Sequence, residues 1–376
     1  MSRVIIKRGS SFLPDEAEAM AEFAAQTGKE GLSVIILFCS PSYDLSRLGD
    51  EIARHYSCPV IACTTAGEVA SGLGYRNDGI VGVGLSSSEL VAHTRLITPL
   101  DKFDAEASVR FADALQNELT MGAEFDATKM FGFMLIDGLS MLEEQLTAAL
   151  FSSLKGVPLI GGSAGDALRF ESTWVYHDGK FHNNAALFTL FETTLPFKTF
   201  RIQHFVPSDD RLVITEADGA KRIVYEINGE PAAQEYARTL NLQVDELTPQ
   251  VFAAYPVMLR INGEYFVRSI QKVNDDGSLT FFCAIDNGLV LTVAKGSNLL
   301  ENLQQNLRQL KEEMPDMQLI LGCDCILRRL ELVQKDLLTQ ATPILDEVNF
   351  VGFSTYGEQF NGIHVNQTLT GLALGG

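Results

Sequence analysis

The chain has 376 residues, of which 46% are hydrophobic and 20% charged, and this composition is typical of a globular protein with two or three domains. Its 29 basic and 48 acidic residues give a formal net charge of −19, which opposes binding to nucleic acid or to an anionic membrane. No stretch approaches the about 20 apolar residues of a membrane span. The apolar run Val4-Ile5-Ile6 is also too short for a secretory leader. We therefore expect a cytoplasmic protein that neither inserts into membranes nor binds nucleic acid.

The first 31 residues predict a short strand and a helix over residues 15–27. Pro14 precedes this helix and Gly28 follows it, which are favourable start and stop residues. We expect this segment to lie outside the repeats that follow.

A repeated unit begins at residue 33, where an apolar strand over 33–38 is followed by an amphipathic helix over 44–56. A second apolar strand then ends in Cys63-Thr64-Thr65-Ala66-Gly67-Glu68, a bend formed by glycine and a carboxylate. The same order recurs around Gly161-Gly162-Ser163-Ala164-Gly165-Asp166, with a helix over 139–154, and around Ser354-Thr355-Tyr356-Gly357-Glu358, with a helix over 326–338. A further helix, predicted over 105–119, leads into the second copy. Short apolar strands joined by a helix favour a buried parallel pair, and a strand after the bend can return antiparallel. The predicted fold class is therefore mixed α/β, with repeated β-α-β-turn-β units forming mixed sheets covered by helices.

The three acids at these bends, Glu68, Asp166 and Glu358, have two interpretations. Carboxylates in turns commonly accept backbone N–H groups, so each can simply cap its turn. Alternatively, three equivalent bends at one rim of the sheets shape a ligand pocket, because ligands favour the ends of strands in such folds.

Between the second and third copies the pattern becomes rich in strands. Asp178-Gly179 predicts a hairpin in which His177 pairs with Lys180 and Val175 with His182. Strands predicted over 198–227, a helix over 231–240 and a second hairpin around Asp275-Asp276-Gly277 then form a β-rich insertion before the last repeat.

The bends, together with Ile227-Asn228-Gly229-Glu230-Pro231-Ala232, Tyr236 and Asn366-Gln367-Thr368, resemble the FIST family of sensory domains. The resemblance implies an N-terminal strand and helix over 1–31, a FIST N-terminal domain over 32–220 and a FIST C-terminal domain over 221–376. It also implies a non-catalytic, ligand-binding sensor of bacterial two-component signal transduction.

Within the family, the overall architecture resembles the NosP group, whose members bind haem and nitric oxide and regulate a partner histidine kinase. The resemblance therefore implies haem as a cofactor, a gas or small molecule as the ligand and a histidine kinase as the partner, and it leaves a homodimer open.

A haem sensor needs an axial ligand, most often histidine, at the wall of an apolar cavity. His204 follows Phe200 in an apolar strand near the junction of the two FIST parts, so it is the first candidate for haem binding and for the iron. His364, which follows the third bend, is the second. Cysteine and tyrosine can also bind haem iron, and a hydrogen-bonded structural role remains open for both histidines.

Two other functions remain to be weighed. The chain can be a FIST module without haem that binds an amino acid or other small metabolite, with Glu68, Asp166 or Glu358 holding an ammonium group. An enzyme is disfavoured because the sequence contains no nucleophile elbow, P-loop, HExxH motif or Rossmann fingerprint.

Overall fold

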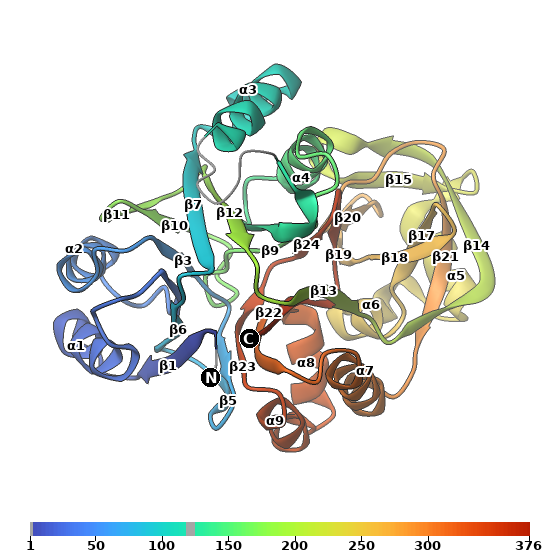
Figure 1. The fold of residues 1–376 in the computed structure, drawn as a ribbon. Coiled ribbons are helices and arrows are strands. Elements are labelled where there is room, and N and C mark those ends of the chain that lie inside the picture. Colours follow the sequence, from blue (N-terminus) through green and yellow to red (C-terminus); the bar gives the residue numbers. More distant parts are fainter. Residues whose placement is uncertain (1–2, 118–124) are drawn as a thin grey trace. The chain divides into compact units, whose positions relative to one another are not determined.

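A computed structural model describes residues 3–117 and 125–376 of the chain (Figure 1). Backbone contacts divide the chain into two compact units. The first, which we call the three-sheet unit, comprises Met1–Ile202, Gln304–His364 and Leu369–Gly376. The second, which we call the inserted unit, comprises Gln203–Leu303 and Val365–Thr368.

The three-sheet unit contains three copies of one module. Module 1 consists of β1 (Ile5–Ser11), α1 (Glu16–Thr27), β2 (Val34–Cys39), α2 (Leu45–His55), β3 (Val60–Thr64), β4 (Glu68–Ala70), β5 (Gly74–Arg76) and β6 (Ile80–Ser86). Module 2 consists of β7 (Leu90–Ile97), α3 (Ala105–Gln116), β8 (Met130–Ile136), α4 (Glu143–Ser153), β9 (Leu159–Ser163), β10 (Val175–His177), β11 (Lys180–His182) and β12 (Ala186–Thr193). Module 3 consists of β13 (Phe197–Ile202), α7 (Leu299–Glu313), β22 (Met317–Cys325), α8 (Ile326–Gln334), α9 (Leu338–Asp346), β23 (Phe350–Thr355), β24 (Glu358–Phe360), β25 (Ile363–Val365) and β26 (Leu369–Gly375).

Each module places its hairpin in the sheet of another module. The three sheets have the orders β1-β6-β2-β3-β10-β11, β7-β12-β8-β9-β24-β25 and β13-β26-β22-β23-β4-β5. In each sheet the two central strands are parallel, and the borrowed hairpin pairs antiparallel with the strand that ends in the bend. Module 1 thus completes the sheet of module 3, module 2 that of module 1, and module 3 that of module 2. The result is a cyclic exchange among three similar modules.

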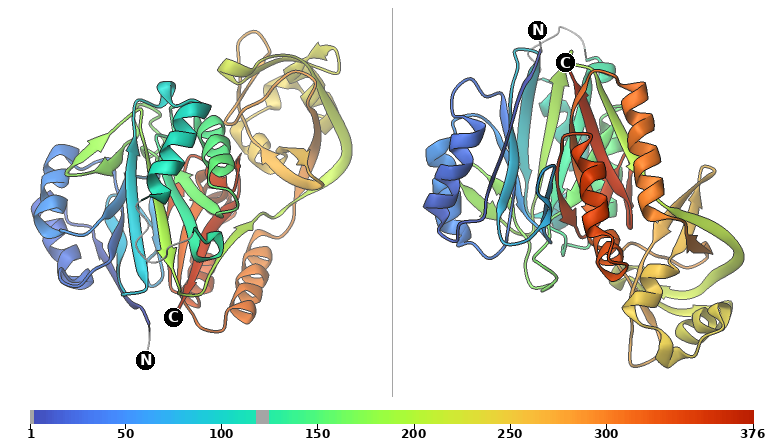
Figure 2. Two further views of the ribbon diagram at one scale, coloured as in Figure 1. Left: turned by 45° about the horizontal axis from the view of Figure 1, so that its top comes forward. Right: turned by 90° about the horizontal axis from the view of Figure 1, so that it is seen from below.

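The inner faces of the three sheets pack on one another and form one apolar core. Ile36 and Phe38 of β2, Phe133 of β8 and Phe353 of β23 are among its buried members. The rings of Phe38 and Phe353 stack with their centroids 4.4 Å apart, which joins modules 1 and 3 directly. The helices cover the outer faces of the sheets (Figure 2). Two-sided burial explains why the central strands are almost continuously apolar.

Local sequence fixes where the helices begin. The carboxylate of Asp15 accepts the backbone N–H groups of Ala17 and Glu18 at the start of α1. The carboxylate of Asp44 likewise accepts those of Ser46 and Arg47 at the start of α2. Such N-caps satisfy donors that a helix cannot satisfy itself, and each contributes about 1 kcal/mol.

The inserted unit has its own sheet and its own core. Its strands are β14 (Phe205–Asp218), β15 (Ile223–Ile227), β16 (Glu230–Pro231), β17 (Val257–Ile261), β18 (Glu264–Arg268), β19 (Ile270–Val273), β20 (Leu279–Phe281) and β21 (Val290–Gly296). They form an antiparallel sheet in the order β18-β17-β21-β14-β15-β20-β19, with β16 beside β15. Two helices, α5 (Ala232–Leu240) and α6 (Pro249–Ala254), accompany this sheet. Tyr236 of α5 is fully buried in this core, and its hydroxyl donates to the carbonyl of Tyr255 at 2.5 Å.

The predicted fold class is confirmed, including mixed sheets, covering helices and a β-rich insertion before the last repeat. The predicted hairpin register, Val175 with His182 and His177 with Lys180, is also confirmed. The predicted boundary at 220/221 between the two FIST domains stays a prediction, because the compact units are defined by backbone contacts alone. Two details differ from the predictions. Residues 5–27 belong to module 1, because β1 pairs along its whole length with β6. The predicted helix over 326–338 is shorter, and a second helix, α9, follows it. The predicted end of the helix over 105–119 lies outside the described residues.

Candidate ligand site at the junction of the three bends

The three bends meet at one end of the three-sheet unit and are joined by a ring of backbone hydrogen bonds. The N–H of Ala66 donates to the carbonyl of Ser354 at 2.9 Å, Tyr356 donates to Ser163 at 3.2 Å, and Gly165 donates to Thr64 at 3.0 Å. Each module is therefore bonded to the next around the ring. The gathering of the bends follows from the hairpin exchange, because each strand end must pass beside the next to reach its partner sheet.

Glycine is required at two of the bends. A side chain at Gly165 would place its first carbon 2.6 Å from the backbone nitrogen of Ala66, too close for a real contact. Gly67 has φ 132°, and a carbon added there would lie 1.5 Å from Nη1 of Arg329. The guanidinium of Arg329 thus occupies the space that Gly67 leaves open and donates to the carbonyl of Ala66 at 3.1 Å.

Glu68 is fully buried and only half satisfied. Its Oε1 accepts the hydroxyl of Thr65 at 2.7 Å, whereas its Oε2 makes no hydrogen bond within the described residues. Burial raises the pKa of Glu68 to about 7, although the Thr65 hydroxyl and the Arg329 charge both act to lower it. The backbone N–H of Gly79 also lies close enough to lower this pKa, but it does not meet the geometry of a hydrogen bond to Oε2. A buried acceptor without a partner costs about 1–3 kcal/mol, and Oε2 is therefore a position where a proton or a ligand donor would be stabilising.

Asp166 differs from Glu68, because donors surround it. Its carboxylate accepts the backbone N–H groups of Phe170, Glu171 and Ser172, at 2.7–3.0 Å, and the hydroxyl of Tyr356. Burial acts to raise the pKa of Asp166, but these hydrogen bonds outweigh burial and hold it below its ordinary value. Asp166 therefore braces the loop that follows its bend, in which Ala167, Leu168 and Phe170 all have positive φ.

Glu358 is equivalent to Glu68 in module 3. It is also fully buried and accepts the hydroxyl of Thr355, three residues earlier, as Glu68 does from Thr65. The two bends thus share a Thr-x-x-Glu arrangement. At the bend of Asp166 the threonine is replaced by Ser163, whose hydroxyl accepts from the side chain of Gln359 at 3.0 Å.

A buried charged cluster extends from Arg329 into the start of α8. Arg328 is 1% exposed and donates to Asp324 at 2.7 Å, and the other oxygen of Asp324 accepts the hydroxyl of Tyr75 at 2.6 Å. Burial acts to lower the pKa of Arg328, but the charge of Asp324 raises it above its ordinary value. Arg329 also donates to the side chain of Asn77 at 2.8 Å. Hydrogen bonds from Tyr75 to Asp324 and from Arg329 to Asn77 therefore tie module 1 to module 3 beside Glu68.

The two candidate histidines belong to different compact units. His204 belongs to the inserted unit, where its ring lies 4.1 Å from that of Phe205 and its carbonyl accepts the hydroxyl of Ser297. His364 lies on β25 in the three-sheet unit, with Nδ1 3.3 Å from the amide nitrogen of Gln359. Each side chain is about 1% exposed. Binding a haem at either ring would therefore require the segments packed around it to move apart. In the described residues, no group of three histidine, cysteine, aspartate or glutamate side chains is arranged to hold a metal ion.

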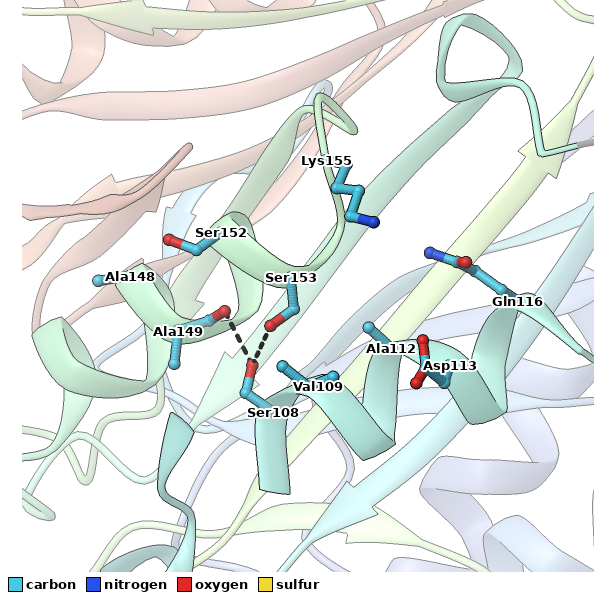
Figure 3. Close-up of a pocket in the computed structure, with 10 residues that line it drawn as sticks. All are labelled: Ser108, Val109, Ala112, Asp113, Gln116, Ala148, Ala149, Ser152, Ser153 and Lys155. Carbon is cyan, nitrogen blue, oxygen red and sulfur yellow. Dashed lines mark hydrogen bonds between the residues drawn. The ribbon is translucent and has the colours of Figure 1, made fainter. Parts of the chain in front are cut away.

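Two hollows in the three-sheet unit lie away from the bends. An apolar cavity of about 10 Å³ in the core, lined in part by Phe131, Phe191 and Leu372, has room for no more than a water molecule. A shallow groove of about 460 Å³ lies between α3 and α4 (Figure 3). The hydroxyl of Ser108 in this groove bonds to Ala149 and Ser153, and the polar side chains of Asp113, Gln116, Ser152 and Lys155 also line it.

The sequence prediction missed several residues of this site, namely Thr65, Tyr75, Asn77, Asp324, Arg328 and Arg329. One signal was present in the chain. Asp324 ends an apolar strand, and Arg328 and Arg329 follow within the first turn of the next helix. Charged residues at the carboxyl end of a parallel strand lie where such folds bind ligands.

The repeated α/β modules join their strand ends around buried carboxylates and arginines, and ligands in such folds favour the ends of strands. Residues 33–230 match the FIST N domain and residues 232–361 match the FIST C domain. These matches cover most of the chain, which therefore belongs to the FIST family, whose domains are small-ligand sensors of signal transduction.

One curated relative is an uncharacterised protein, MJ1623, of Methanocaldococcus jannaschii. It is 22% identical to this chain over 311 residues, which are 77% of this chain and 59% of the relative. The chain thus spans about three fifths of the length of the curated relative that it matches. In the described part of the chain, no helix is both long enough and apolar enough to cross a membrane.

Proposed function

We propose that this protein is a sensor that binds a small polar metabolite of the amino-acid type beside Glu68 and reports its presence to a separate histidine kinase. The observation that carries the proposal is the state of the Glu68 carboxylate, which is fully buried with one oxygen unpaired. A ligand ammonium group would supply the missing donor. Arg329 lies beside it, and its guanidinium is suited to a ligand carboxylate.

Comparison of the three acids favours Glu68 over the others. Both oxygens of Asp166 already accept hydrogen bonds, so it has little capacity left for a ligand. Glu358 accepts from Thr355 as Glu68 does from Thr65, but it has a further interaction and neither of its oxygens is left without a hydrogen bond. The amino-acid class therefore fits the first bend best.

The test is a melting assay with the twenty amino acids and common polyamines. A true ligand at one hundred times its Kd should stabilise the wild type by about 2.7 kcal/mol. We expect Glu68→Gln to lose this stabilisation, because a neutral amide cannot pair with an ammonium group. Glu358→Gln is the matched control and should keep the ligand-induced stabilisation.

The affinity for the ligand should also rise with pH through about 7, because the ligand cation pairs with ionised Glu68. Equal stabilisation of the wild type and Glu68→Gln would exclude Glu68 as the ligand-binding residue.

A haem-based nitric oxide sensor is the second candidate, suggested by the resemblance to the NosP group. His204 supports it, since its ring lies against that of Phe205, which belongs to an apolar cluster. Bound haem would supply an iron centre for the gas, and His204 or His364 would hold that iron.

The test of this candidate is the absorption spectrum of protein produced with added haem. A Soret band that moves on adding nitric oxide, and that His204→Ala removes, is the result expected for this candidate. A colourless protein that an amino acid stabilises supports the first.

A further inference from the structure

The groove between α3 and α4 has the size of a ligand pocket and is open to solvent (Figure 3). Its volume of about 460 Å³ lies within the range of about 300–1,000 Å³ that is typical of small-molecule pockets. The two helices are joined at one end, where the hydroxyl of Ser108 donates to the carbonyl of Ala149 at 2.8 Å and lies 2.7 Å from the hydroxyl of Ser153. A ligand can therefore enter the groove without the rearrangement that the burial of Glu68 requires.

The walls of the groove include small and apolar side chains. Val109 and Ala112 lie on α3, and Ala148 and Ala149 lie on α4. Because alanine side chains are short, helices that touch at Ser108 leave a hollow beside that contact. Val109 is 53% exposed, and an apolar group seated in the hollow would remove its surface from water, which is favourable. These walls therefore suit the apolar body of a ligand.

One charge of each sign lines the groove. Asp113 and Gln116 lie about one turn apart on α3, and Lys155 follows the end of α4 on the other side. In Figure 3 the side chains of Lys155 and Gln116 point toward each other from opposite sides of the groove. Within residues 3–117 and 125–376, none of these three side chains takes part in a hydrogen bond or an ion pair. Their polar atoms are therefore available to a ligand.

The other charged residues of the two helices leave this balance unchanged. Glu106 and Arg110 of α3 pair with each other at 3.3 Å. Glu143 and Glu144 lie in the first turn of α4, at the end of the helix away from Lys155. The groove thus presents one cation and one anion, which favours a ligand that carries both charges over a simple anion or cation.

We propose that this groove binds a zwitterion with an apolar body, such as a short apolar peptide or an aliphatic amino acid. Lys155 holds the ligand carboxylate, Asp113 holds its ammonium group, and the apolar part covers Val109. Gln116 can bond to either end, because its amide both donates and accepts. Lys155 has φ 42°, and backbone strain of this kind is concentrated at ligand sites. The site is separate from Glu68 and does not rest on the proposed function.

The experiment is calorimetric titration of the full chain with leucine and leucyl-leucine, each also as its C-terminal amide and as its N-acetyl form. We expect leucine or leucyl-leucine to bind, and the tighter of the two identifies amino acids or peptides as the source. The amides lack the carboxylate and the acetyl forms lack the ammonium group, so each should bind about tenfold more weakly than its parent. Equal affinity for the parent and both blocked forms would refute the recognition of two charges. Failure of both parents to bind would overturn the proposal.

Two variants assign each ligand charge to its partner. Lys155→Met should weaken binding of the zwitterion about tenfold but leave binding of its amide unchanged, because the amide has no carboxylate. Asp113→Asn should weaken binding of the zwitterion by a similar factor but leave binding of the N-acetyl form unchanged. The matched control is Lys29→Met, which removes an exposed lysine of module 1 and should leave every affinity unchanged. Unchanged affinity for the zwitterion in both groove variants would exclude the groove as its site.

The Glu68→Gln variant separates the groove from the first bend. If Lys155→Met and Asp113→Asn lose affinity for the zwitterion while Glu68→Gln retains it, the groove is the site, and apolar zwitterions are excluded as ligands of the first bend. If Glu68→Gln alone loses affinity, the zwitterion binds at the first bend, which supports the proposed function and refutes the groove.

Discussion

Glu68 and Asp166 occupy corresponding bends of two modules, yet their ionisation behaviour is opposite. Both are buried, and both lie next to the ring of backbone hydrogen bonds. Four donors hold the pKa of Asp166 low, whereas Glu68 has one hydroxyl donor and a pKa raised to about 7. The topology determines where a carboxylate lies, and the local donors determine whether it is charged. The bend with too few donors is the one suited to receive a ligand.

The largest expected effect is that of Asp166→Ala. Three backbone N–H groups and the hydroxyl of Tyr356 would lose their charged acceptor, so we expect a loss of about 4 kcal/mol in the free energy of unfolding. Urea denaturation at pH 7 measures it. The exposed Asp50→Ala on α2 is the control and should change stability by less than about 0.5 kcal/mol. A small effect at Asp166 would mean that the loop does not depend on its cap.

Gly67→Ala tests whether the first bend depends on close approach by Arg329. The new methyl group would lie against the guanidinium at an unfavourable φ, and we expect a cost of about 3 kcal/mol. Gly72→Ala provides the comparison, because Gly72 also has positive φ, 82°, but no atom lies within 4 Å of the added carbon. Its cost should be about 1 kcal/mol. Equal costs at both positions, measured by thermal melting, would contradict a special role for the Arg329 contact.

Glu68→Gln should change the dependence of stability on pH. The folded-state pKa of about 7 lies above the ordinary value of 4.5, so the folded protein binds the proton more tightly than the unfolded chain. Wild-type stability should therefore be full below about pH 4.5 and fall as pH rises toward 7 and above. The variant, which cannot ionise, should be more stable than the wild type by on the order of 2–3 kcal/mol at pH 8 and similar to it at pH 5. Parallel stability curves for the two proteins would refute the raised pKa.

The smallest effect is expected from the two threonines of the shared arrangement. Thr65→Val removes the single hydroxyl donor to Glu68 and should cost about 1 kcal/mol while raising the pKa of Glu68 further. Thr355→Val removes the corresponding donor to Glu358 and should cost a similar amount. Thr65→Val should extend the fall in stability to higher pH, because it raises the pH at which folded Glu68 ionises. Unfolding curves collected between pH 5 and pH 9 would show whether the two bends respond differently.

Much of the fold could be predicted from local sequence. The apolar strands, the helices predicted over 15–27 and 44–56 and the turn at Asp178-Gly179 depend on signals over a few residues, and the structure has them close to where they were expected. The exchange of hairpins could not be predicted in this way, because β4 carries no local signal that selects β23 over β3. The same limit applies to the site. The acids of the bends are visible in the sequence, but the partnership of Glu68 with Arg329 joins residues 261 positions apart and exists only after that exchange.

The exchange of hairpins also constrains how the chain can be made. Strand β4, produced early in synthesis, has its antiparallel partner β23 near the other end of the chain. Until the ribosome has released residues 350–355, the first hairpin has an open edge that other chains could pair with. A nascent chain of this protein would therefore depend on chaperones for most of its synthesis, and its soluble yield should fall when translation is slowed before the third module.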